Sequence, residues 1–244
     1  MKAYLDNNIL VSIEANQIDI ELFKELSKKQ LSFVFSYAHI AELLEAKDYE
    51  RTLKAKRINT IFEVTGNCYS YSNGDKVEFK IENPENVINV FKMHSNFYTL
   101  LRNLIKNPQV NREEIINELG LNKKQMNNYN AEEVVFHLNR ILEKKFSFDF
   151  NQMILQGGSM LREKIYSVFN FLDILGYWTD KKNEKSNIAR ANDATHVFFA
   201  SGCGYFVSND RRARNKAMVA YKLFDIKTKV YSYDEFRKLN IRKE

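Results

Sequence analysis

Short apolar segments alternate with helix-forming segments at both ends of the chain, and this alternation constrains the fold more than any other feature. Near the amino end, residues 2–5 and 31–36 are short runs rich in β-forming side chains, and residues 205–208 and 229–232 repeat the pattern near the carboxyl end. Between these runs the apolar residues recur at helical spacing. Apolar strands that alternate with helices form a parallel sheet buried on both faces, so the sequence predicts an α/β fold.

The helices of this α/β body are expected next to the strands. They are predicted over 18–29, 37–62, 192–201, 211–224 and 233–239. The middle of the chain differs, because after a hairpin signal at Asn73-Gly74 the pattern becomes almost entirely helical. We therefore expect a body made of residues 1–72 and 151–244, interrupted by a mainly helical insertion at 73–150.

The insertion itself shows several helical stripes. The longest has apolar and aromatic side chains at one helical face, namely Val87, Phe91, His94, Tyr98, Leu101 and Ile105. Residues 112–129 resemble a helix-turn-helix, but the second helix would present only Lys123 and Lys124 as basic residues. We therefore favour a helical hairpin that packs the insertion over a DNA-reading motif. Further helices are predicted at 131–144 and 161–175.

Charge and composition exclude several classes of protein. The net charge is +6, and the basic excess lies entirely after residue 210, where eleven Lys and Arg stand against four Asp and Glu. No apolar run reaches the roughly 18–20 residues of a membrane span, and Asp6 interrupts any signal-peptide core. The only cysteines, Cys68 and Cys203, form no metal-binding or disulfide pattern, which favours a protein of the cytoplasm that does not associate with membranes.

Four acidic residues occupy related positions in the predicted body. Asp6 and Asp210 each end a strand, whereas Glu42 lies in the helix after the second strand and Asp193 near the start of a later helix. The carboxyl ends of parallel strands share one edge of the sheet, where ligands bind. Four carboxylates gathered there would repel one another unless cations neutralise them, and oxygen ligands suit Mg²⁺ or Mn²⁺. Two such ions would balance the four negative charges.

A simpler explanation exists for each carboxylate taken alone. Asp6, Asp193 and Asp210 all stand where an aspartate caps a helix, and Glu42 could pair with Lys47 or Arg51 on the helix surface. Together, four acids at one sheet edge are hard to attribute to capping, and we favour a shared site.

The four acids also lie in stretches that resemble the PIN-domain nucleases. These stretches are residues 4–10 (YLDNNIL), 36–44 (SYAHIAELL), 192–196 (NDATH) and 206–210 (FVSND). The resemblance implies a PIN-like three-layer fold with a central parallel sheet and metal-dependent cleavage of single-stranded RNA. It implies that Asp6, Glu42, Asp193 and Asp210 bind the metal, with Asn8, Ser208 and Asn209 as supporting polar groups.

The basic residues after Asp210 fit a nuclease of this kind. Arg211 and Arg214 lie on the helix that follows the last acid, where they are expected to contact a substrate phosphate. The expected partners are RNA and either an antitoxin protein or a second copy of the chain, as in a toxin or a defence effector. Two alternatives remain open: a catalytically idle protein that binds nucleic acid or a partner, and a structure-selective DNA nuclease. A phosphatase with Asp6 as nucleophile is disfavoured, because Asn8 stands where a second aspartate would be needed.

Overall fold

The computed structural model describes residues 1–45, 53–93, 112–147, 149–179 and 184–239. The chain divides into two compact units, and neither is continuous in sequence. The first comprises Met1–Thr99, Phe199–Arg211 and Thr228–Glu244, and the second comprises Leu100–Phe198 and Arg212–Lys227. These units do not follow the boundaries at 72 and 151 expected from the sequence, and the division into a nuclease body and an insertion stays a prediction.

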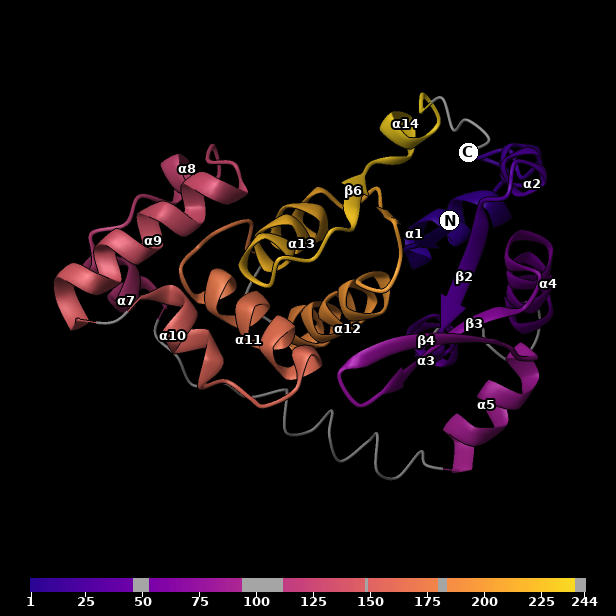
Figure 1. Ribbon diagram of the computed structural model, residues 1–244, viewed down its shortest axis with the longest axis horizontal. Helices are drawn as coiled ribbons and strands as arrows, with labels where there is room; N and C mark the ends of the chain where they lie inside the picture. The colour runs from indigo at the N-terminus through magenta and orange to yellow at the C-terminus, as the bar shows by residue number, and fades with distance from the viewer. Residues whose placement is uncertain (46–52, 94–111, 148, 180–183, 240–244) are drawn as a thin grey trace. The chain divides into compact units, whose positions relative to one another are not determined.

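The first unit contains a six-stranded sheet. Its strands are β1 (Lys2–Leu5), β2 (Ser32–Ser36), β3 (Cys68–Asn73), β4 (Lys76–Ile81), β5 (Tyr205–Val207) and β6 (Lys229–Tyr231). They lie in the order β4-β3-β2-β1-β5-β6, and all neighbours are parallel except β3 and β4 (Figure 1). The α/β prediction is confirmed, with a sheet that is mixed and mostly parallel. The predicted hairpin at Asn73-Gly74 is present, and it places β4 at the edge of the sheet beside β3.

Helices of the first unit cover one face of this sheet. They are α1 (Asn7–Glu14), α2 (Glu21–Lys28), α3 (Tyr37–Glu45), α4 (Lys54–Thr65), α5 (Pro84–Met93) and α14 (Tyr233–Phe236). Leu5, Phe33 and Val207 point to this face and join one hydrophobic core with these helices. Tyr4 and Phe206, at the alternate positions, are also buried and bring their rings within 6.2 Å of each other. Both faces of the central strands are therefore apolar, as parallel strands require.

Two expected helices extend into parts of the chain outside the described residues. The helix predicted over 37–62 is represented by α3 and α4, and residues 46–52 between them are not described. The stripe that begins at Val87 is present in α5 as far as Phe91, and its remaining positions from His94 onward lie outside the described residues.

All the regular elements in the described part of the second unit are helices. Its helices are α7 (Arg112–Leu119), α8 (Lys123–Met126), α9 (Ala131–Phe146), α10 (Phe150–Leu155) and α11 (Leu161–Ile174), with most of α12 (Glu184–Ala200) and α13 (Arg211–Leu223). Asn122 caps α8 by accepting from the amides of Lys124 and Gln125. The core of the second unit includes Val134 and Leu138 of α9. In the described part of the chain, no helix combines the length and apolar character needed to cross a bilayer.

Candidate active site at the carboxyl ends of the strands

Asp6 lies at the junction between β1 and α1. Its backbone is extended and its side chain caps α1, since Oδ1 accepts a 2.7 Å hydrogen bond from the Asn7 amide. The backbone amide of Asp6 donates to the carbonyl of Val207 on the neighbouring strand, at 2.8 Å. Asp6 is only 5% exposed, so the carboxylate is buried at the end of the sheet. Capping and membership of a site are therefore compatible roles for this residue.

Two polar side chains converge on the other oxygen of Asp6. The hydroxyl of Ser208 donates to Oδ2 at 2.5 Å, and the side-chain amide of Asn8 donates to the same oxygen at 2.6 Å. The pairing of β1 with β5 sets Leu5 opposite Val207, so Asp6 and Ser208 are the next residues at the shared edge. The supporting role expected for Asn8 and Ser208 therefore has a direct geometric counterpart, across about two hundred residues of sequence.

Asp210 is tied to the same cluster through its backbone. Its amide donates to the Ser208 hydroxyl at 3.0 Å, and the amide of Asn209 donates to the side-chain carbonyl of Asn8, also at 3.0 Å. The Asn209 side chain accepts from the Tyr233 amide at 3.2 Å, which connects this turn to α14. Asp210 itself is exposed. The turn at 208–210 is thus bonded both to the Asp6 loop and to the carboxyl-terminal helix.

Glu42, half-buried on α3, acts electrostatically on the same neighbourhood. Burial raises the pKa of the Tyr4 phenol well above its usual value, the hydrogen bond with Ser36 opposes this rise, and the negative charges of Asp6 and then Glu42 add to it. The negative charges of both carboxylates therefore act on the Tyr4 hydroxyl. In the first unit the structure brings together Asp6, Ser208 and Asp210 through hydrogen bonds, and Glu42 is related to them by its charge.

A buried polar cluster that the sequence pattern does not reveal supports the strand ends beside Asp6. The Tyr4 hydroxyl lies 2.6 Å from the Ser36 hydroxyl, and Ser36 also accepts from the Ala38 amide as a cap of α3. The Ser36 amide can only donate, so Nδ1 of His39 is the acceptor in their 3.0 Å bond and the ring proton lies on Nε2. That proton is donated to the carbonyl of Leu5, 2.7 Å away. A serine at a strand-to-helix junction was the available signal for Ser36; for His39 the sequence held none.

Asp193 lies in the second unit, and its place in α12 differs from the sequence-based expectation. The predicted helix began at Asn192, whereas α12 begins at Glu184, so Asp193 is in the helix interior and is not its cap. The residues before Asn192 include Ala189 and Arg190, which are strong helix formers, and the helix extends back through them. This removes capping as the explanation for Asp193. Its grouping with the other three acids stays a prediction.

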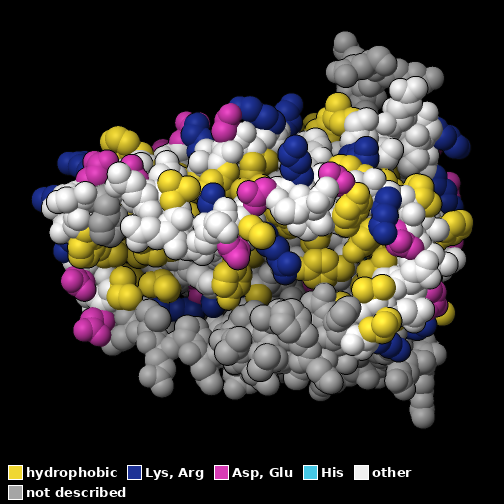
Figure 2. Space-filling model, turned by 60° about the horizontal axis from the view of Figure 1, so that its bottom comes forward, with side chains coloured by type: hydrophobic (Ala, Val, Ile, Leu, Met, Phe, Trp, Pro, Cys, Tyr) yellow, Lys and Arg dark blue, Asp and Glu magenta, His cyan; other side chains and the backbone are white. Residues whose placement is uncertain are grey.

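The two proposed phosphate-binding arginines are divided between the units. Arg211 begins α13 and is exposed in the first unit, and Arg214 is half-buried in the second. Figure 2 shows one face of the molecule, on which Lys and Arg side chains are interspersed with Asp, Glu and apolar side chains. On this face, contact with an anionic polymer would depend on particular cations and not on one uniform basic surface.

The carboxylates of the candidate site suit a hard cation, although they do not form a ready-made metal site among the described residues. Among the residues that the structure describes, no three carboxylate, histidine or cysteine side chains form a group able to hold a metal ion. Carboxylate oxygens are nevertheless the donors that Mg²⁺ and Mn²⁺ prefer, and Mg²⁺ commonly uses about one or two carboxylates and several waters. The chemistry of Asp6, Glu42 and Asp210 therefore fits the expected metal, and the four-carboxylate metal site stays a prediction.

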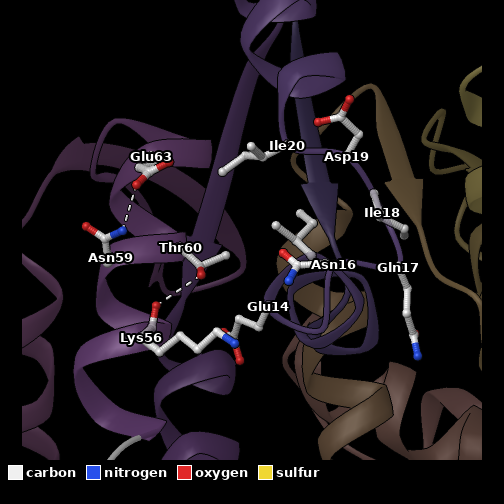
Figure 3. Close-up of a pocket in the computed structure, with 11 residues that line it drawn as sticks. Glu14, Asn16, Gln17, Ile18, Asp19, Ile20, Lys56, Asn59, Thr60 and Glu63 are labelled. Atoms are coloured by element: carbon white, nitrogen blue, oxygen red, sulfur yellow. Dashed lines mark hydrogen bonds between the residues drawn. The ribbon is translucent and has the colours of Figure 1, made fainter.

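A pocket of about 540 Å³ lies elsewhere in the first unit, between the end of α1, the following segment and α4. Figure 3 shows its polar wall, where Asn59 donates to Glu63 and Thr60 donates to the carbonyl of Lys56. Glu14 lines the pocket and forms a buried ion pair with Arg57, whose guanidinium also donates to Asn7 beside Asp6. The pocket is thus connected to the Asp6 loop through one buried ion pair.

Comparison with known proteins adds no further assignment. No family model, no curated protein and no solved structure matches the chain.

Proposed function

We propose that the protein is a metal-dependent endoribonuclease with a PIN-like three-layer fold. Its carboxylates Asp6, Glu42, Asp193 and Asp210 would bind Mg²⁺ or Mn²⁺, with two ions expected from the charge balance. The observation that carries the proposal is the hydrogen-bonded cluster of Asp6, Asn8 and Ser208. It supports the proposal because the mostly parallel sheet brings residues from the two ends of the chain together at the strand edge where ligands bind in such folds.

The chain's own residues have separate tasks in this proposal. Asn8 and Ser208 fix the Asp6 carboxylate, and Ser208 also binds the backbone of Asp210. Arg211 and Arg214 bind a phosphate of the RNA, as charge-assisted hydrogen bonds favour. When bound, the divalent ions supply an activated water and stabilise the leaving oxygen.

The biological setting is proposed on narrower grounds. Both cysteines are free, which agrees with a protein of the reducing cytoplasm. A role as a toxin or defence effector, with an antitoxin protein or a second copy of the chain as partner, follows from the resemblance to PIN-domain nucleases alone.

The reaction type can be tested on the RNA products. The protein is incubated with total RNA and Mn²⁺, with and without a chelator, and the new ends are mapped and chemically characterised. Attack by water leaves linear phosphate ends, and chelation is expected to abolish cleavage. Products with 2′,3′-cyclic phosphate, formed in the presence of chelator, would show attack by the neighbouring hydroxyl and contradict the proposal.

The same assay separates the alternatives. RNA binding with a steep salt dependence but without cleavage would favour a catalytically idle binding protein. Cleavage of structured DNA in the absence of RNA cleavage would favour a DNA nuclease.

A further inference from the structure

The second unit contains a buried ionic cluster around Asp173 of α11. The Asp173 side chain is only 1% exposed, and three cations pair with it: Arg112 of α7, Arg190 of α12 and Lys216 of α13. The side chains of Arg190 and Lys216 are 5% and 3% exposed. One carboxylate thus joins four helices, and Figure 1 shows three of them, α11, α12 and α13, next to one another.

The bonds that the two arginines of this cluster form are directional. Oδ2 of Asp173 accepts from Arg112 and, at 2.5 Å, from Arg190, and Oδ1 lies 3.5 Å from the Lys216 ammonium. The Arg190 guanidinium also donates to the side chains of Asn170 and Asn187, at 2.7 and 3.1 Å. Each of the three guanidinium nitrogens therefore donates one hydrogen bond, and α12 is bonded to α11 at both Asn170 and Asp173.

Such a cluster constrains helices differently from apolar packing. Well-packed apolar side chains of similar volume often stabilise a fold as well as a buried ion pair does. Hydrogen bonds from a planar guanidinium require a defined direction, so they restrict rotation and sliding of a helix. The guanidinium bonds of Arg190 therefore define the position of α12 against α11, and the ion pair of Asp173 with Lys216 holds α13 beside them.

These two helices carry residues of the proposed nuclease. Asp193 lies three positions after Arg190 on α12, which places both on the same helical face, and Arg214 lies two positions before Lys216 on α13. We propose that Asp173 is a positioning residue of this nuclease: its carboxylate orients the helix that bears Asp193 and the helix that bears Arg214. This inference rests on the proposed function, in which Asp193 binds the metal and Arg214 the phosphate.

The experiment compares three variants of the full chain. Asp173→Asn keeps the side-chain volume and one acceptor but removes the charge. Arg190→Lys keeps the positive charge beside Asp173 but loses the donors to Asn170 and Asn187. It therefore tests the same link between α12 and α11 if Asp173→Asn does not fold. Glu132→Gln is the matched control, because Glu132 also pairs with α13, through Lys222 at 2.6 Å, but on the exposed surface.

Two quantities are measured on folded protein at one temperature. Mn²⁺ binding is titrated calorimetrically without substrate, and RNA cleavage is resolved into kcat and KM across Mn²⁺ concentrations. Asp173→Asn and Arg190→Lys are expected to weaken Mn²⁺ binding by about 10-fold or more, the usual size for outer partners of metal ligands. Saturating Mn²⁺ should restore kcat but not KM, since Arg214 also shifts. Glu132→Gln should resemble the wild type.

The outcomes distinguish failure of the positioning role of Asp173 from failure of the proposed nuclease function. A wild-type protein that binds Mn²⁺ and cleaves RNA, with Asp173→Asn and Arg190→Lys indistinguishable from Glu132→Gln, overturns the positioning role alone. A wild-type protein that neither binds Mn²⁺ nor cleaves RNA overturns the proposed function, and with it the role of Asp173 in that reaction.

Discussion

At the residue scale, the candidate site depends on short polar side chains at strand ends. Asp6 accepts from the Asn7 amide, the Asn8 side chain and the Ser208 hydroxyl, so both of its oxygens are oriented by the protein. A carboxylate bound in this way loses little further freedom when it meets a cation. Asn8 is suited to orienting this carboxylate, because its amide nitrogen donates to Asp6 and its side-chain oxygen accepts from the Asn209 amide.

The buried Tyr4 side chain makes the free energy of unfolding depend on pH in alkaline solution. Its pKa is raised by burial and by the charges of Asp6 and Glu42. Above the pKa of an unfolded tyrosine, about 10, the unfolded chain releases a proton that the folded chain retains, so stability is lost as the pH rises from there. Tyr4→Phe removes this proton, and its free energy of unfolding should fall less steeply in alkaline solution.

The measurement is urea unfolding of both proteins across the alkaline range. The other tyrosines contribute equally to both and cancel in the difference. The lost bond to Ser36 shifts the variant by an amount that does not depend on pH. Parallel stability curves for the two proteins would contradict the buried, protonated Tyr4.

At the element scale, the sequence predicted strands and most helices where the apolar period was clear. The runs at 2–5, 31–36 and 205–208 coincide with β1, β2 and β5 to within a residue at each end. The start of α12 was misplaced, since Asn192 resembles a cap in sequence although the helix passes through it. The contact of Asp6 with Ser208 was predictable from the shared strand edge, whereas the His39 bonds depend on side-chain packing that local pattern does not encode.

The ion pair of Glu14 with Arg57 joins α1 to α4 and is testable at the same scale. Both side chains are 7% exposed, so Arg57→Met leaves a buried carboxylate without its cation. Loss of one partner of a buried pair costs about 3–5 kcal/mol, whereas replacing both partners is often nearly neutral. We expect Arg57→Met to be strongly destabilised and the double variant Glu14→Gln with Arg57→Met to recover most of the loss.

Denaturant unfolding of the wild type, both single variants and the double variant completes this cycle. The ion pair of Lys24 with Glu63, 3.7 Å apart and exposed to solvent, serves as the control for the buried pair. If the effects of Glu14→Gln and Arg57→Met simply add, the two residues are not coupled and the assignment is wrong.

At the scale of the whole molecule, the chain passes repeatedly between its two compact units. The segment at 73–150, expected as an insertion, includes β4 and α5, and both belong to the sheet-containing unit. Ile88 of α5 is fully buried in that unit, and the β4 residue Val77 lies directly against Gly202. The change to helical periodicity after the hairpin therefore does not coincide with a change of compact unit.

Removal of residues 73–150 is therefore expected to unfold the remaining chain. The deletion takes away an edge strand and part of the core, and it should abolish a cooperative thermal transition measured by circular dichroism. A deletion variant that melts cooperatively with strand content intact would instead support an autonomous body interrupted at residue 73.

The central claim is that the Asp6 and Asp210 carboxylates act together in RNA hydrolysis, and single-turnover cleavage of one short RNA with Mn²⁺ tests it most directly. Asp6→Asn keeps a residue that caps helices well, so α1 should survive, and Asp210→Asn changes an exposed side chain. Asp225→Asn is the control, since Asp225 has a positive φ that asparagine tolerates and lies in an exposed ion pair with Lys227. We predict that both site variants fold and lose at least about 100-fold in rate, while Asp225→Asn cleaves like the wild type. Wild-type rates in folded Asp6→Asn and Asp210→Asn would contradict the account.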